Sequence, residues 1–316
     1  MKLTYGEARA RAVYRELDGN PEILMLGTGI AHPFNPDIGL DDRYPQQVLW
    51  PPVSEFANLS LATGASMAGM RTLVPISNAT FMYYGWSALV QEAANIRYLT
   101  GGQVTAPAVF HIQTGFRRGG GAQHEHTPHA MLHNQPGLVI FAPGTPAEVD
   151  AVFHQALTGS DPALIADHVL LCDFEGEVGD QPAGLDRANL VRAGEDVLII
   201  TYSLMVQRSL QAAQMLEREG ISAAVLSVPR ISPAPVTSIV EAAAGYKRLL
   251  FVDEARAAGS PVSQFMARVF EAGGGQRARL LCTANAHAPL SPALLDELVP
   301  TVERIAQTVR ELCAQR

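Results

Sequence analysis

The sequence predicts an α/β fold with two doubly wound domains, and three observations support this. Short apolar runs alternate with longer helical segments along most of the chain, a pattern typical of a parallel sheet covered by helices on both faces. With 316 residues, 47% of them hydrophobic, the chain can fill the cores of two medium-sized domains. Between about residues 173 and 194 the composition shifts to Asp, Glu, Gly and Pro, which indicates a linker.

The first half of the chain begins with a predicted helix from Thr4 to Leu17. Thr4 can cap this helix, and Glu7 occupies the capping-box position. Thr145 opens a later helix with the same signal. Apolar runs and small-residue or aromatic segments give the other elements, which are strands at 22–29, 71–77, 106–115, 137–143 and 162–171, and helices at 54–70, 81–102 and 145–159.

The second half of the chain repeats the alternation after the linker. Its predicted strands lie at 196–203, 222–228, 248–255 and 278–284, and its predicted helices at 205–220, 236–245, 261–274 and from Ser291 onward. We therefore expect one domain over residues 1–185 and a second over residues 186–316.

The composition and net charge of the chain limit the classes of partner and the cellular location that we expect. The formal net charge is -8 and no block of Lys and Arg offsets it, so we expect no nucleic-acid partner. An acidic surface also disfavours anionic membranes, and no run of 18 apolar residues is present to span one. Cys172, Cys282 and Cys313 are few and scattered, which suits the reducing cytoplasm.

A glycine-histidine segment at 119–129, GGGAQHEHTPH, is the most unusual part of the sequence. A strand would place His124 and His126 on one face, and a helix would bring His129 and His133 together. However, HExxH is missing and no acid or cysteine at standard spacing completes a zinc site, so we predict that this chain holds no metal ion. Two interpretations stay open: a solvated loop, or a loop whose glycines let a histidine approach a ligand.

Two further features lie at the ends of predicted strands, where α/β sheets bind ligands. Glu55 in PPVSEFANL opens a helix of small residues, and Phe81 and Tyr84 in NATFMYYGW lie at a strand-to-helix junction. Taken alone, Glu55 can be a first-turn acid that the helix dipole favours, and the aromatic residues can be core. A dinucleotide site is not supported, because GTGIAH at 27–32 has only half of GxGxxG.

The order and spacing of several segments resemble the beta subunit of the thiamine-diphosphate-dependent E1 component of 2-oxo acid dehydrogenases. The pyruvate, acetoin and branched-chain enzymes belong to this family, and transketolase is a wider relative. The resemblance covers nearly the whole chain. Its segments are PVSE at 52–55, GASMAGMRTLVPI at 64–76, FMYY at 81–84, YLTGGQ at 98–103, GAQH at 121–124, PGLVIFAPGTPAE at 136–148, and DVLIITYS and FVDEA in the second half.

The resemblance implies a role for each domain and for four residues. The first domain would be a thiamine diphosphate pyrimidine-binding domain, and the second a transketolase C-terminal-type domain. Glu55 and His124 would be the catalytic residues: Glu55 hydrogen-bonds the aminopyrimidine of the cofactor, and His124 faces the reacting carbon. Phe81 would stack on the pyrimidine, and Tyr84 would line the same pocket.

The resemblance also implies a partner, because no GDG segment is present to hold magnesium and the diphosphate. In this family a separate alpha subunit carries that motif. We therefore expect a shared thiamine diphosphate, magnesium held by the partner, and an α2β2 heterotetramer that is inactive without the alpha subunit. The complex would decarboxylate a small-molecule 2-oxo acid and pass the acyl unit to an acceptor, for which a lipoyl-bearing E2 is the leading candidate.

Departures from the family pattern lie around the substrate entrance. Trp50 replaces the usual Asp, and HEH replaces the usual HSQ at 124–126. His126, Arg117 and Arg118 are therefore candidate substrate contacts, since arginines can hold a phosphate or carboxylate. Two alternatives stay open: a split transketolase-like subunit that transfers a two-carbon ketol unit, and an inactive structural subunit. Retention of the two catalytic residues and the stacking Phe81 argues against the second.

Overall fold

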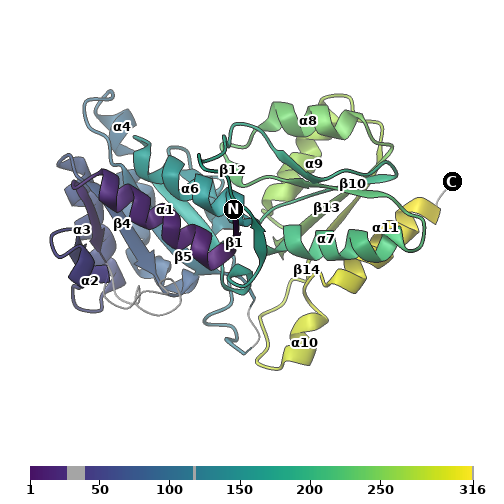
Figure 1. Cartoon of the computed structure of the whole chain (residues 1–316), viewed down its shortest axis with the longest axis horizontal. Coiled ribbons are helices and arrows are strands. Elements are labelled where there is room, and N and C mark those ends of the chain that lie inside the picture. The colour runs from purple at the N-terminus through teal and green to yellow at the C-terminus, as the bar shows by residue number, and fades with distance from the viewer. Residues whose placement is uncertain (27–39, 117–118, 315–316) are drawn as a thin grey trace. The chain divides into compact units, whose positions relative to one another are not determined.

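The computed structural model describes residues 1–26, 40–116 and 119–314, and the chain forms two compact α/β units (Figure 1). The first unit consists of segments 1–114, 132–141 and 145–184, and the second of segments 115–131, 142–144 and 185–316. Both have a sheet of mainly parallel strands flanked by helices, so the predicted fold class is confirmed. Within the described residues, no helix is long and apolar enough to cross a bilayer.

In the described part of the first unit, six parallel strands form the sheet, in the order β6-β7-β5-β4-β2-β3. The two central strands, β4 and β5, are almost entirely buried, which explains why they read as continuous apolar runs. The strands are β2 (Ile23–Leu26), β3 (Val48–Leu49), β4 (Arg71–Ile76), β5 (Ala108–Thr114), β6 (Val139–Phe141) and β7 (Ala163–His168).

Helices α1 (Tyr5–Gly19) and α6 (Pro146–Thr158) pack side by side on one face of this sheet (Figure 1). The capping box predicted at the start of α1 is confirmed, because the Glu7 amide donates to the Thr4 hydroxyl at 3.2 Å and the Thr4 amide donates to Glu7 Oε2 at 2.8 Å. Thr145 caps α6 in the predicted place, with the Glu148 amide at 3.2 Å from its hydroxyl.

Helix α3 (Glu55–Met67) covers the opposite face of the sheet. On β4, the Thr72 hydroxyl lies 2.8 Å from that of Ser66 on α3, whereas Leu73 points to the α1 side. Neighbouring residues of a strand point to opposite faces, so α3 and α1 sandwich β4. The small residues of α3 allow this close approach.

The prediction of a single long helix over residues 81–102 is wrong. The structure has a 3-10 helix η1 (Ala79–Gly85), a π-helix η2 (Ser87–Ala93) and a short α4 (Ile96–Leu99). A side chain at Gly85 would come within 2.9 Å of Leu59 on α3, so η1 lies against α3 as closely as a glycine permits. Tight packing on α3 therefore overrides the regular helical pattern.

The sheet of the second unit has the order β14-β13-β10-β11-β9, with β9 antiparallel to β11 and the other pairs parallel. Helices α8 and α9 contact each other, as do α7 and α11, and the two pairs lie above and below the sheet in Figure 1. The strands are β9 (Asn189–Arg192), β10 (Val197–Thr201), β11 (Ala223–Ser227), β13 (Arg248–Arg256) and β14 (Arg277–Thr283), and the helices α7 (Leu204–Glu217), α8 (Val236–Ala244), α9 (Pro261–Glu271) and α11 (Val302–Ala314).

Some short elements were not predicted. The expected linker contains β8 (Glu175–Glu177), which pairs antiparallel with β1 (Lys2–Thr4), as well as β9. The helix predicted from Ser291 onward is two helices, α10 (Pro292–Asp296) and α11, because Pro300 between them has no amide hydrogen to continue a helix. Other short elements are α2 (Leu40–Arg43), α5 (His129–Leu132), η3 (Val169–Leu171) and β12 (Arg230–Ser232).

Candidate active site

Glu55 is the first residue of α3, immediately after the capping Ser54. Its side chain is half-buried and lines a small pocket at the carboxyl end of β4, together with Asn58, Leu59, Val74, Pro75, Ile76 and Ser77. Among the described residues, none forms a hydrogen bond or an ion pair with its carboxylate. A carboxylate without a protein partner in a partly apolar pocket is available to a ligand.

Phe81 and Tyr84 lie on η1, which follows β4 and packs against α3. The Phe81 amide donates to the Asn78 carbonyl at 3.0 Å and its side chain is half-buried, whereas Tyr84 is 70% exposed. Neither is among the described residues that line the Glu55 pocket. The structure thus places Phe81 and Glu55 on touching elements, and Tyr84 largely in solvent.

His124 lies in a compact turn of the second unit. The amides of His124 and Glu125 both donate to the Gly121 carbonyl, at 3.1 and 3.0 Å. The Gly120 amide donates to Glu125 Oε1 at 2.9 Å, and the Glu125 side chain is fully buried. The glycine-histidine segment is therefore packed along much of its described length, while His124 itself stays partly exposed.

His124 and His126 lie in the predicted loop, outside regular strands, so no strand places their side chains on one face. His126 Nε2 hydrogen-bonds the Ala122 carbonyl at 2.7 Å, which closes the turn. His129 and His133 do not share a helix, since α5 ends at Leu132. Over the described parts of the chain, no group of three or more His, Cys, Asp or Glu side chains could hold a metal ion.

Arg117 and Arg118 lie outside the described residues, so their predicted contact with a substrate stays a prediction. Glu55, Phe81 and Tyr84 belong to the first unit, and His124 and His126 to the second. The sequence did not reveal that the glycine-histidine segment packs with the second unit. Phe116 is 2% exposed and packs in a cluster with Ala288, Leu295 and Val299. A large apolar residue in an otherwise polar loop is the sequence feature that could have indicated this packing.

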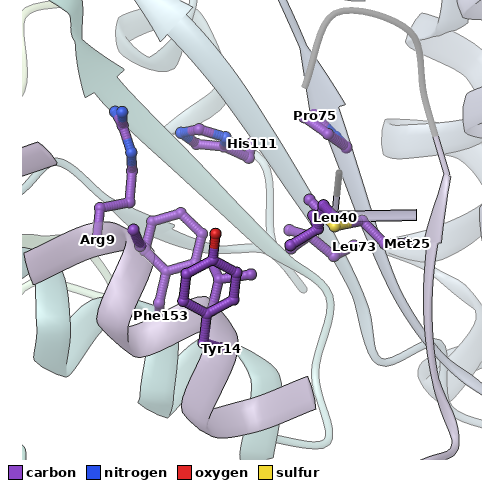
Figure 2. Close-up of a pocket in the computed structure, with 10 residues that line it drawn as sticks. Arg9, Tyr14, Met25, Leu40, Leu73, Pro75, His111 and Phe153 are labelled. Carbon is purple, nitrogen blue, oxygen red and sulfur yellow. The ribbon is translucent and has the colours of Figure 1, made fainter. Parts of the chain in front are cut away.

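A second pocket lies between α1 and the sheet of the first unit (Figure 2). Its walls are mostly apolar, and Arg9 and His111 form its polar end. Both are held by the buried Asp167, with Arg9 Nη1 at 2.6 Å and His111 Nε2 at 2.9 Å from its Oδ2 atom. The cavity of about 20 Å³ has room for roughly one water molecule. We assign this pocket to the core of the unit.

Two family models match the chain in order. The pyrimidine binding domain of transketolase matches residues 1–171, and the C-terminal domain of transketolase matches residues 186–305. The beta subunit of acetoin:2,6-dichlorophenolindophenol oxidoreductase from Cupriavidus necator is 31% identical, over 98% of this chain and 97% of that protein. The chain belongs to the E1 beta-subunit family of the transketolase superfamily.

Other members of the E1 beta family support the same assignment. The 2-oxoisovalerate dehydrogenase subunit beta of Bacillus subtilis is 30% identical, over 85% of this chain and 84% of that protein. A mitochondrial pyruvate dehydrogenase E1 subunit beta-2 of Oryza sativa is also 30% identical, over 80% of this chain and 70% of that protein. Members of this family are subunits of larger thiamine-diphosphate-dependent enzymes.

A solved structure shares the fold of this E1 beta chain. It is titled a split gene transketolase in an inactive beta4 tetramer, and it matches with a TM-score of 0.81 over 98% of both chains. The sequence identity is only 19%, so this likeness concerns the fold alone.

Proposed function

We propose that this chain is the beta subunit of a thiamine-diphosphate-dependent enzyme that decarboxylates a 2-oxo acid together with an alpha-type subunit. The acyl unit then passes to an acceptor, with a lipoyl group on an E2 protein as the leading candidate. The observation that carries the proposal is the Glu55 carboxylate, which lines a pocket at the end of β4 and has no protein partner among the described residues. The resemblance to E1 beta subunits implies a catalytic acid at this position.

The side chains around Glu55 match the aminopyrimidine of thiamine diphosphate in their chemistry, although the pocket itself, at about 10 Å³, does not enclose the ring. This ring is flat and carries hydrogen-bonding nitrogens, and the pocket offers one carboxylate against the apolar walls of Leu59, Val74 and Ile76. When bound, the cofactor would supply a nucleophilic thiazolium carbon for reaction at the 2-oxo group. Glu55 would hold a proton at its carboxyl oxygen for a pyrimidine nitrogen, and Phe81 would offer its ring as a stacking surface. Tyr84 is 70% exposed and does not line the Glu55 pocket, so its contact with the ring stays a prediction.

His124 would exchange a proton with the substrate or the acyl acceptor through its imidazole, which is partly exposed on a turn held by Gly121. His126 would contact the substrate beside it, and Arg117 and Arg118 would bind a substrate carboxylate or phosphate. A well-positioned acid-base group contributes about 10²–10⁴ to a rate. Loss of His124 would therefore impair transfer more than cofactor binding.

The proposal assigns the rest of the cofactor site to the partner. An alpha-type subunit carrying the GDG motif would hold magnesium and the diphosphate, in an α2β2 assembly. We place the boundary between the two domains of this chain near residue 185, which agrees with the break between the two structural units after Gly184. The cytoplasmic location remains a prediction from the scattered cysteines.

The transketolase-type alternative depends on Arg117 and Arg118, which lie outside the described residues, and no other observation favours it. The inactive-subunit alternative conflicts with the available carboxylate of Glu55.

Co-expression tests the proposed function. The chain should be purified alone and with an alpha-type subunit encoded beside it, and assayed for 2-oxo-acid-dependent reduction of dichlorophenolindophenol with thiamine diphosphate and magnesium. We expect turnover only from the complex. Ketol transfer from a sugar phosphate without turnover of any 2-oxo acid would replace the proposal with the transketolase-type alternative. A complex inactive in both assays would support a structural subunit.

A further inference from the structure

A buried hydrogen-bond network in the second unit is centred on Asp253. This residue lies on β13 and is 1% exposed. Its carboxylate accepts hydrogen bonds from the Tyr202 hydroxyl at 2.6 Å, the Ser260 hydroxyl at 2.5 Å and the Ala255 amide at 2.8 Å. Burial raises the pKa of the Asp253 carboxyl, which reflects the cost of holding a charge away from water.

Tyr202 extends this network to His129. The Tyr202 hydroxyl has one hydrogen, and that hydrogen is donated to Asp253. Its oxygen therefore accepts from the Nε2–H of His129, which lies 3.1 Å away. The two rings also meet edge to face, with centroids 5.6 Å apart and an interplanar angle of 85°. The contact thus fixes both the tautomer and the orientation of the His129 ring.

His129 lies in the segment that carries His124. Before His124, Phe116 is buried among apolar residues of the second unit. After it, the His126 carbonyl accepts from the Gly115 amide at 3.2 Å, and His129 joins the Asp253 network. The turn is therefore anchored on both sides of His124, first by an apolar cluster and then by a polar network.

We infer that His129, Tyr202 and Asp253 are positioning residues that hold the His124 turn in its working geometry. The inference rests on the proposed role of His124 and gives the second unit a role in positioning this residue. An apolar anchor would hold a loop without burying a carboxylate, and burying one is costly. A buried network of directional hydrogen bonds fixes one geometry, which a proton-transferring histidine requires.

Hydrogen-deuterium exchange on the full chain tests the positioning directly. The Tyr202→Phe variant removes the hydroxyl and keeps the ring, so amides in residues 115–131 should exchange about tenfold faster. Tyr246→Phe is the matched control, because the Tyr246 hydroxyl bonds the Gly194 carbonyl at 3.0 Å in the same unit but outside this network. Unchanged exchange of 115–131 in Tyr202→Phe would overturn the inference.

Turnover of the complex with the alpha-type subunit is the second readout. Tyr202→Phe should lower kcat by about tenfold, because small displacements of a reacting group are costly, and should leave the KM for the 2-oxo acid within about twofold. His129→Gln keeps an N–H donor toward Tyr202 and should retain more of both loop protection and kcat than His129→Ala. Equal losses in those two variants, or a loosened loop with normal kcat, would contradict the positioning role.

Failure of the proposed function is distinguishable from failure of this inference. A wild-type complex without 2-oxo acid turnover would refute the proposed function. The exchange measurement on the chain would still decide whether Tyr202 holds the segment.

Discussion

Asp167 is the centre of a buried hydrogen-bond network in the first unit. It is 1% exposed on β7 and accepts hydrogen bonds from Arg9 and His111, and from Tyr5 at 2.8 Å. Burial alone would raise the pKa of its carboxyl, but Arg9 and His111 together hold this pKa well below its usual range. Burial also lowers the pKa of His111, so the ring contributes as a neutral donor near pH 7.

Replacing Asp167 with Asn should destabilise the chain by about 3–5 kcal/mol at pH 7, since Arg9 would remain buried without its counter-ion. The lowered pKa of Asp167 stabilises the fold above the ordinary value of 3.8, and this contribution is lost as the pH falls below about 4. Urea unfolding from pH 7 to pH 3 should therefore show the gap between wild type and variant narrowing.

Asp161→Asn serves as the control for that comparison, because the Asp161–Arg97 pair is about half exposed and such pairs contribute little. It should shift stability by less than about 1 kcal/mol. A similar loss in both variants would contradict the importance assigned to the buried network.

Individual site residues differ in how far the sequence could reveal them. Glu55, Phe81 and His124 belong to short segments whose order along the chain resembles a family, so they could be proposed from sequence. Tyr202 and Asp253 are 51 residues apart, and they meet because β10 and β13 are neighbours in the sheet. The order of strands cannot be read from apolar runs, so this network was not predicted.

At the scale of elements, the close contact between η1 and α3 can be tested by a single substitution. Gly85→Ala would place a methyl group 2.9 Å from Leu59, and overpacking of this kind costs about 1–3 kcal/mol. Because η1 carries Phe81, we also expect weaker binding of thiamine diphosphate to the complex, measured by cofactor titration of turnover.

Gly64→Ala provides the matched control, since nothing lies within 4 Å of an added methyl group at this α3 position. Alanine is also the better helix former, so thermal unfolding of this variant should match or exceed that of wild type. A Gly85→Ala chain as stable as wild type would show that η1 can move away from α3.

Element boundaries were predictable where local chemistry decides them. Thr4 with Glu7 and the capping Thr145 marked the starts of α1 and α6, because a cap acts within one helical turn. The segment 81–102 was mispredicted because its winding depends on the distant Leu59. Strand β9 was missed for a similar reason, as its pairing partner β11 lies on the far side of α7 in the sequence.

At the scale of the whole molecule, family membership and the lone carboxylate of Glu55 point to an enzyme completed by a second chain. Members of this family are subunits of larger enzymes. The sequence has no GDG segment that would bind a diphosphate. The central claim is therefore that Glu55 serves a cofactor shared with an alpha-type partner.

The most direct test compares Glu55→Gln with wild type in the complex, using 2-oxo-acid-dependent dye reduction with thiamine diphosphate and magnesium in excess. Glu303→Gln is the matched control, an exposed acid in the first turn of α11. We predict that Glu55→Gln lowers turnover at least about 100-fold, as expected for a group that manages a proton, with Glu303→Gln within about twofold of wild type. Full turnover by Glu55→Gln would contradict the account.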